Sequence, residues 1–327
     1  MENRKITFSQ AITEALDEEM ARDPKVVVMG EDIGPQGGVF GTSRGLFDKY
    51  GCDRVMDTPI SENSFVGCAV GAAITGLRPV VEIMYIDFIT LAMDQIINQA
   101  AKVRYMYGGK VKVPLVVRTQ GGAGKGNAGH HSQSLEVFFC HIPGLKVVMP
   151  STPHDAKGLL KSSIRENNTV VFIEHKLLYN TEGEIPPGEN IVELGKADIK
   201  RKGTDITIVA VSYMVLKALE AAGELEKEWI SCEVIDPRTL SPLDTGTIIE
   251  SVKKTGRLLV IHESAVRAGT GAYIAAEIGN SVFDYLDHPI EILGGLNSPI
   301  PYAHVLEDAV IPQVKDIKER VKKILNK

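Results

Sequence analysis

Short apolar segments alternate with helical segments along almost the whole chain, and this alternation limits the fold more than any other feature of the sequence. A first helix is predicted after the capping-box sequence Thr7-Phe8-Ser9-Gln10, because Ile12, Leu16 and Met20 follow at a spacing of four. Further helices are predicted over 63–75, 91–105 and 155–165, and strands over 26–30, 79–85, 113–119, 146–149 and 170–174. Short apolar strands separated by helices are typical of a mostly parallel sheet covered on both faces, so the sequence predicts an α/β fold.

The composition changes between Asn180 and Gly203, where the chain becomes polar and rich in residues that form turns. A length of 327 residues allows about two domains at roughly 150 residues each. We therefore place a first domain at 1–180, a linker at 181–203 and a second, smaller α/β domain at 204–327. In the second domain the same alternation predicts strands over 206–211, 232–235, 258–261 and 290–293, and helices over 214–225, 244–253, 271–283 and 314–325.

Charge and cysteine content argue against several classes of function. The chain has 36 Lys and Arg against 42 Asp and Glu, a net charge of −6, so it lacks the overall positive field that nucleic-acid binding usually requires. The 4 cysteines lie far apart without a CxxC pair, which argues against a zinc site or a disulfide framework and leaves buried free thiols as the expectation. Apolar runs fall short of a ~20-residue membrane span and the first residues lack signal or transit features, so a cytoplasmic protein with no membrane partner is expected.

The segment Gly124-Lys125-Gly126-Asn127-Ala128-Gly129 follows a predicted strand and matches GxGxxG, the fingerprint of a dinucleotide site. A nucleotide-dependent oxidoreductase is therefore one hypothesis. The glycines extend back to Gly121, however, in a loop too long for the tight turn of that motif. The next strand also ends in Met149-Pro150, where an acidic residue should bind the ribose. A substrate-facing loop explains the pattern better.

Glu62 and His131 are the strongest candidates for acid–base chemistry. An acid in the first turn of a helix is stabilised by the helix dipole, which is the purely structural interpretation of Glu62. Its apolar neighbours, Ile60 among them, disfavour the charged carboxylate and favour a protonated group that can exchange a proton with a ligand. His130 and His131 are adjacent on an extended segment and point apart, which favours one acid–base histidine over a shared metal ion.

Several short motifs follow one another along both domains. In order, they are Gly30-Glu31-Asp32, Asp57-Thr58-Pro59-Ile60-Ser61-Glu62, Gly76-Leu77-Arg78-Pro79, Asp94-Gln95-Ile96-Ile97-Asn98, His131-Ser132-Gln133, Pro143-Gly144-Leu145-Lys146-Val147-Val148, Val234-Ile235-Asp236-Pro237-Arg238-Thr239-Leu240-Ser241-Pro242-Leu243-Asp244 and Pro299-Ile300-Pro301-Tyr302-Ala303. Each motif alone is weak, but their joint order over the whole chain is specific. Together they resemble the beta subunit of the thiamine-diphosphate-dependent component of 2-oxo acid and acetoin dehydrogenase complexes, a transketolase-like family.

The resemblance implies a transketolase-like pyrimidine-binding domain with a parallel sheet, followed by a smaller α/β transketolase C-terminal domain. It implies that Glu62 contacts a ring nitrogen of the aminopyrimidine of thiamine diphosphate and stabilises its imino tautomer, the role expected of a protonatable carboxyl group. It further implies that Phe88 stacks on this ring, that Ile60 contributes to the cofactor site, and that His131 assists acyl transfer to a lipoyl group. His130 stands where the family usually has Gln.

The resemblance also implies metal sites and partners. A potassium ion is expected at Leu115, Ser163, Ile164, Glu166 and Asn168, mostly on backbone carbonyls, which are hard oxygens suited to a hard cation. No Gly is followed by Asp in the chain, so the motif that binds the cofactor's diphosphate through Mg²⁺ is absent. The family's solution is an alpha subunit that holds Mg²⁺ and the diphosphate, in a heterotetramer of two alpha and two beta chains that docks on a dihydrolipoyl acyltransferase core.

The leading hypothesis is therefore the beta subunit of a pyruvate or acetoin dehydrogenase, active with an alpha subunit and passing an acyl group from a small 2-oxo acid or acetoin to lipoamide. A branched-chain 2-oxo acid dehydrogenase beta subunit is the alternative within the family. A non-catalytic assembly subunit is the alternative from a different class. The sequence leaves the choice of substrate open.

Overall fold

The computed structural model describes residues 4–327 and divides the chain into two compact units. The first unit ends at Leu194, and the second begins at Gly195. The segment Gly122–Val137 also belongs to the second unit, although it lies within the sequence of the first. The apolar pattern of this segment does not predict that it belongs to the second unit. None of the helices between residues 4 and 327 has both the length and the apolar character needed to cross a membrane.

The first unit is built on a parallel sheet. Its strands are β2 (Val26–Gly30), β3 (Val55–Asp57), β4 (Arg78–Ile83), β5 (Val116–Gly121), β6 (Lys146–Val148) and β7 (Val170–His175). Within this unit they lie in the order β6, β7, β5, β4, β2, β3, and every neighbouring pair is parallel. The central strands are buried along their length, which explains their continuous apolar runs.

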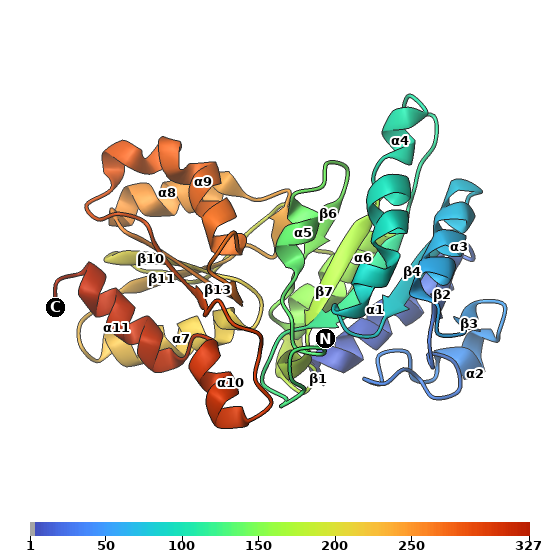
Figure 1. Cartoon of the computed structure of the whole chain (residues 1–327), viewed down its shortest axis with the longest axis horizontal. Coiled ribbons are helices and arrows are strands. Elements are labelled where there is room, and N and C mark those ends of the chain that lie inside the picture. The colour runs from blue at the N-terminus through green and yellow to red at the C-terminus, as the bar shows by residue number, and fades with distance from the viewer. Residues whose placement is uncertain (1–3) are drawn as a thin grey trace. The chain divides into compact units, whose positions relative to one another are not determined.

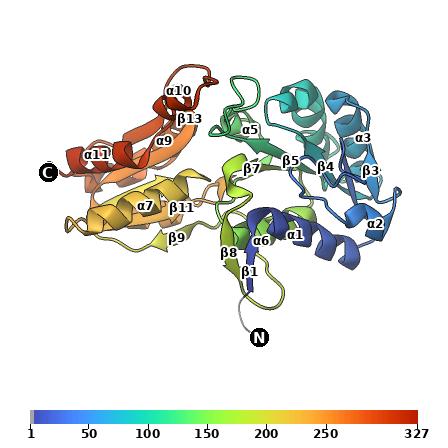
Figure 2. The same cartoon turned by 90° about the horizontal axis from the view of Figure 1, so that it is seen from below.

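Helices cover both faces of this sheet (Figure 2). They are α1 (Phe8–Arg22), α2 (Leu46–Tyr50), α3 (Glu62–Ile74) and α6 (Pro153–Arg165), with α5 (Glu136–Cys140) running across the division between the units and a small antiparallel pair of β1 (Arg4–Thr7) and β8 (Glu182–Ile185). The predicted capping box is confirmed, since the Thr7 side chain accepts a hydrogen bond from the Gln10 amide and the Gln10 side chain accepts one from the Thr7 amide.

The helix predicted over 91–105 is wrong as a single regular element. The chain instead forms a 3₁₀ segment η1 (Phe88–Ala92), a π-helical segment η2 (Gln95–Ala100) and the short helix α4 (Val103–Met106). Apolar periodicity identified the face that packs inward but not the hydrogen-bonding pattern, which local packing decides. Here α3 packs against both η1 and η2.

The second unit has its own sheet (Figure 1). Its strands are β9 (Asp198–Arg201), β10 (Ile206–Ala210), β11 (Cys232–Asp236), β13 (Leu258–Ala265) and β14 (Glu291–Gly295), in the order β14, β13, β10, β11, β9 with only β9 antiparallel. Helices α7 (Met214–Glu226) and α11 (Val314–Ile324) pack together, as do α8 (Thr245–Thr255) and α9 (Thr270–Val282). The remaining elements of this unit are β12 (Thr239–Ser241), α10 (His304–Val310) and the 3₁₀ turn η4 (Phe283–Tyr285), whereas the 3₁₀ turn η3 (Lys176–Leu178) belongs to the first unit. The predicted two-domain α/β class is confirmed.

The cysteine prediction holds in part. Within residues 4–327 none of the cysteines forms a disulfide, but Cys52 and Cys68 are exposed and Cys140 is half-buried. Only Cys232 is buried, and burial raises the pKa of its thiol to about 12. The exposed pair lies outside the strands that form the core, which the spacing of the cysteines could not reveal.

His262 is a fully buried imidazole on β13. Three glycines make room for it, because a Cβ atom at Gly269, Gly271 or Gly294 would approach the ring to 2.8, 2.7 and 2.6 Å respectively. Burial lowers the pKa of His262 from 6.5 to about 4. The ring is therefore neutral in the folded protein at pH 7.

We expect the second unit to lose stability as the pH falls from 6.5 to 4. Over this range His262 binds a proton in the unfolded chain, whereas in the folded chain it stays largely neutral. Above pH 6.5 the imidazole is neutral in both states and causes no loss of stability. Below pH 4 the loss approaches about 3.5 kcal/mol, at roughly 1.4 kcal/mol per pKa unit. Urea unfolding across this range measures the slope, which should be shallower in His262→Asn than in the wild type. His288→Gln, which changes a half-buried histidine, is the control, and equal slopes in all three proteins would contradict the assignment.

Candidate active site

The predicted cofactor residues of the first unit follow the carboxyl ends of neighbouring parallel strands. Glu62 opens α3 shortly after β3 ends at Asp57, and Phe88 opens η1 shortly after β4 ends at Ile83. Because β2 pairs with both β3 and β4, these ends lie at one edge of the sheet. Ligands of open parallel sheets bind at this edge. The packing of α3 against η1 brings the elements of Glu62 and Phe88 together.

Glu62 is 8% exposed, whereas Ile60, two residues earlier, is 84% exposed. A large aliphatic side chain that stands out beside a buried carboxyl group offers an apolar contact to a ligand. Phe88 is half-buried and packs edge-to-face on Tyr85, with ring centroids 6.3 Å apart. Tyr85 packs in turn on Phe40 at 5.6 Å, so the aromatic group at this edge is larger than the single residue predicted.

Glu31 is a member of this site that the sequence interpretation did not assign. It follows the last residue of β2 and is 8% exposed. Burial raises the pKa of Glu31, and the nearby charges of Glu62 and Asp32 raise it further, while the Ser61 amide opposes them by donating a hydrogen bond. Its Oε1 atom has no hydrogen-bond partner among residues 4–327. The motif Gly30-Glu31-Asp32 directly after a strand was the available signal.

These residues fit the aminopyrimidine expected from the resemblance. A buried carboxyl oxygen without a partner can bond a ligand group, and a second buried carboxyl, Glu62, lies close enough for the two charges to interact. An aromatic ring and an exposed aliphatic side chain suit the faces of a planar heterocycle. Among residues 4–327 no cluster of three or more His, Cys, Asp or Glu side chains is arranged to hold a metal ion.

The five residues predicted to hold potassium come together at the opposite edge of the same sheet. Leu115 precedes β5, Asn168 precedes β7, and Ser163, Ile164 and Glu166 lie at the end of α6. The carbonyl of Leu115 accepts the Val170 amide at 2.9 Å, which joins these segments.

A guanidinium group already lies against two of these carbonyls. Arg78 donates to the carbonyl oxygens of Ile164 and Glu166 at 2.7 and 2.6 Å. Each carbonyl oxygen has two acceptor sites, so this pairing leaves one on each for a further ligand. The sequence interpretation did not anticipate this role of Arg78.

His131 lies in the second unit, on the segment Gly122–Val137. It is half-buried, and its amide donates to the Ala128 carbonyl at 3.5 Å. The neighbouring His130 is exposed, in keeping with the expectation that the two rings point apart. Their separate environments fit one functional histidine better than a shared metal ion.

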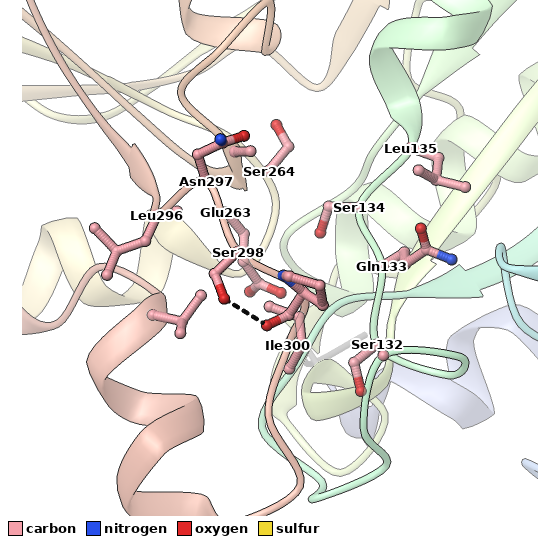
Figure 3. A pocket seen from close by; sticks show the side chains of 15 residues that line it. Ser132, Gln133, Ser134, Leu135, Glu263, Ser264, Leu296, Asn297, Ser298 and Ile300 are labelled. Atoms are coloured by element: carbon pink, nitrogen blue, oxygen red, sulfur yellow. Dashed lines mark hydrogen bonds between the residues drawn. The ribbon is translucent and has the colours of Figure 1, made fainter.

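The second unit contains a cavity of about 350 Å³ (Figure 3), and His131 is not itself among the residues that line it. Residues on both sides of His131 line it, together with residues from β13 and from the segment after β14, namely Gly129, Ser132, Gln133, Ser134, Leu135, Glu263, Ser264, Ala265, Gly295, Leu296, Asn297, Ser298, Pro299, Ile300 and Val310. The hydroxyl of Ser132 is buried and has no hydrogen-bond partner among residues 4–327. The lining thus mixes apolar side chains with neutral hydrogen-bonding groups and one carboxyl group, that of Glu263.

The glycine motif of this loop does not present its amides to a diphosphate. The Glu307 carboxylate accepts hydrogen bonds from Gly124 and Gly126, and the Glu263 carboxylate accepts one from Ala123. In a dinucleotide site such amides bind the ligand's phosphates. Their use by carboxylates of the same chain supports the interpretation as a substrate-facing loop over that of a nucleotide site.

Comparisons with known protein families give two matches that together cover most of the chain. Residues 4–182 match the model described as transketolase, pyrimidine binding domain. Residues 195–317 match the model described as transketolase, C-terminal domain.

Similar proteins include enzyme subunits of matching length. The chain is 48% identical to the beta subunit of acetoin:2,6-dichlorophenolindophenol oxidoreductase from Cupriavidus necator, with 98% of each chain covered. It is also 48% identical to the pyruvate dehydrogenase E1 component subunit beta from Rickettsia conorii, again with 98% of each covered. A solved structure described as a split gene transketolase, inactive beta4 tetramer, has the same fold, with a TM-score of 0.80 over 98% of each chain at 23% identity.

Proposed function

Since this chain belongs to the transketolase-like family that includes the E1 beta subunits of pyruvate and acetoin dehydrogenases, we propose that it is the beta subunit of a thiamine-diphosphate-dependent enzyme that oxidatively decarboxylates pyruvate or cleaves acetoin. The acyl group then passes to lipoamide. The observation that carries the proposal is the buried pair of carboxyl groups, Glu31 and Glu62, at the ligand-binding edge of a pyrimidine-binding domain. A branched-chain 2-oxo acid is the alternative substrate.

Thiamine diphosphate, when bound, would supply the carbon nucleophile that attacks the substrate carbonyl and would accept the electron pair released by carbon–carbon cleavage. Glu62 would contact the aminopyrimidine ring through its carboxyl group and exchange a proton with it. Its burial at the start of α3, near Glu31, places the carboxyl group for this role. Phe88 and Ile60 would hold the planar ring by apolar contact.

His131 serves the second half of the reaction, in which the acyl group moves to the lipoyl acceptor. A neutral imidazole can take a proton from a thiol, and the imidazolium so formed can give a proton to a leaving group. The cavity lined by residues on both sides of His131 offers apolar walls, hydroxyl and amide groups and the carboxyl group of Glu263, which can contact a dithiolane ring and the amide of its alkyl chain.

An alpha subunit completes the enzyme in this proposal. The relatives are named as beta subunits, a name that implies an alpha partner. The alpha chain supplies Mg²⁺ and the diphosphate site in a heterotetramer of two alpha and two beta chains, which docks on a dihydrolipoyl acyltransferase core. Potassium would be held at Leu115, Ser163, Ile164, Glu166 and Asn168, largely by backbone carbonyls, and a higher melting temperature in K⁺ than in Na⁺ at equal ionic strength is the expected sign.

The test is reconstitution with the alpha chain encoded beside this one. We expect turnover of pyruvate or acetoin only in the mixture, and assays with pyruvate, acetoin and branched-chain 2-oxo acids identify the substrate. Equilibrium dialysis of NAD against the beta chain alone should show no binding. The proposal fails if the alanine variant at both Glu62 and His131 keeps wild-type turnover, the result expected of an assembly subunit.

A further inference from the structure

We propose that Glu307 is a positioning residue that holds the loop carrying His131 in its working shape. The proposal rests on the proposed function for the role of His131, whereas the loop contacts that support it are observed directly. Glu307 lies on α10 and is fully buried. Glu307 has no part in the proton exchange or the cofactor contacts proposed above.

Both carboxylate oxygens of Glu307 accept hydrogen bonds from the loop. Oε1 accepts from the Gly124 amide at 2.7 Å, and Oε2 accepts from the Gly126 amide at 3.0 Å. A hydrogen bond from an amide to a charged carboxylate is about twice as strong as a neutral one. Because the two donors, Gly124 and Gly126, are two residues apart, the backbone between them curves around the Glu307 carboxylate.

The loop backbone is shaped for this arrangement. Gly124 and Gly126 have φ angles of +95° and +66°, which favour glycine. A Cβ atom at Gly126 would lie 3.0 Å from the His304 ring, and His304 Nδ1 lies 3.3 Å from Glu307 Oε2. A side chain at Gly126 would therefore press on the group that flanks the carboxylate. Gly124 and Gly126 of the motif are thus explained by the backbone shape in which their amides reach a carboxylate of the same chain.

A second carboxylate holds the start of the same loop. Glu263 Oε1 on β13 accepts from the Ala123 amide at 2.5 Å. The Gly122 amide donates to the Gln133 carbonyl at 3.0 Å, which joins the two ends of the loop. His131 lies between these ends and is linked to Ala128 by its amide. The position of the imidazole therefore depends on the shape of a loop whose middle is attached to Glu307.

The sharpest variant is Glu307→Gln, assayed in the reconstituted alpha and beta complex. Glutamine has the same shape, but one of its two terminal groups is an NH₂, which cannot accept from an amide. One of the two loop bonds is therefore lost with little change in volume. Asp308→Asn is the matched control, because it removes the same charge from an exposed position on the same helix.

Two electron acceptors separate the half-reactions. Turnover with lipoamide requires acyl transfer, whereas reduction of the dye 2,6-dichlorophenolindophenol requires only the first half. We expect Glu307→Gln to lower kcat with lipoamide by ~10-fold or more with little change in KM, since small displacements of a catalytic group cost this much. The dye-linked rate should stay within about twofold of wild type, and Glu307→Asp should recover part of the loss because it keeps two acceptor oxygens.

Hydrogen exchange of the loop gives a readout that is independent of activity. The amides of Gly124 and Gly126 should exchange faster in Glu307→Gln and at the wild-type rate in Asp308→Asn. Unchanged exchange, or faster exchange with an unchanged lipoamide rate, overturns the positioning role. If His131→Ala instead keeps the lipoamide rate, the proposed function of His131 fails, while the exchange result still decides whether Glu307 holds the loop.

Discussion

Glu62→Gln in the reconstituted complex should lower turnover by ~10²-fold to ~10⁴-fold, with both lipoamide and dye as acceptor. The amide keeps the shape of the buried side chain but cannot take up or release a proton near neutral pH, and acid–base groups contribute about this much to enzyme rates. Both acceptors are affected because the step precedes their reduction. Steady-state assays with saturating thiamine diphosphate and Mg²⁺ measure the loss.

Asp48→Asn is the matched control for this substitution. Asp48 is also an acid in the first turn of a helix, α2, but it is exposed. Its replacement removes the same helix-dipole interaction and should leave both rates within about twofold, because surface substitutions have small effects. Near wild-type turnover in Glu62→Gln, or an equal loss in Asp48→Asn, would show that burial beside Glu31 does not set the role of Glu62.

Much of the fold could be predicted because buried parallel strands leave continuous apolar runs. The strands over Val26–Gly30 and Ile206–Ala210 were located to within a residue or so. The elements missed are short or lie at edges, such as β1, β9 and α10. Helix α10 exposes Val305 and Leu306 at 82% and 57%, so its apolar residues do not mark a buried face. The sequence pattern therefore gave no reason to suspect that α10 carries Glu307.

Residues of the candidate site could be predicted where their neighbours in the sequence were enough to indicate a role. Glu62 follows a turn, opens a helix and stands beside Ile60, so the local pattern alone suggested a protonatable group. Glu31 required knowledge that β2 and β3 are neighbours in the sheet, which comes from pairing over a distance along the chain. The same is true of Glu307, because the Gly124 and Gly126 amides that donate to it are 183 and 181 residues away in the sequence. Residues that act across such distances have no local signature.

The buried ion pairs among three charged residues of the first unit could not be predicted for the same reason. Glu82, Arg118 and Glu174 each appear as a polar interruption in a separate apolar strand. In the sheet Glu82 lies directly opposite Arg118, and Arg118 Nη1 donates to Glu82 Oε2 at 2.8 Å. Arg118 also makes a two-bond contact with Glu174, at 2.7 and 3.0 Å. All three side chains are fully buried.

The carboxylates hold this guanidinium strongly. Burial acts to lower the pKa of Arg118, but the charges of Glu174 and Glu82 outweigh it and raise the pKa. Further groups complete the cluster, with Tyr179 Oη donating to Glu174 Oε2 at 2.6 Å and Thr42 Oγ1 donating to Glu82 Oε2 at 3.1 Å. Removal of Arg118 therefore leaves two carboxyl groups buried without their cation.

Arg118→Met should destabilise the protein by about 3–5 kcal/mol, the cost of breaking a buried ion pair by removing one partner. Arg4→Met is the matched control, because Arg4 also makes a two-bond contact with a carboxylate, Glu14, but at an exposed position. There the loss should stay within about 1 kcal/mol, since water solvates the remaining carboxylate. Urea unfolding at pH 7 measures both. The triple variant Glu82→Leu/Arg118→Met/Glu174→Leu replaces all three buried charges by apolar side chains and should recover part of the lost stability. A triple variant less stable than Arg118→Met would show that the unpaired buried carboxylates do not cause the destabilisation of Arg118→Met.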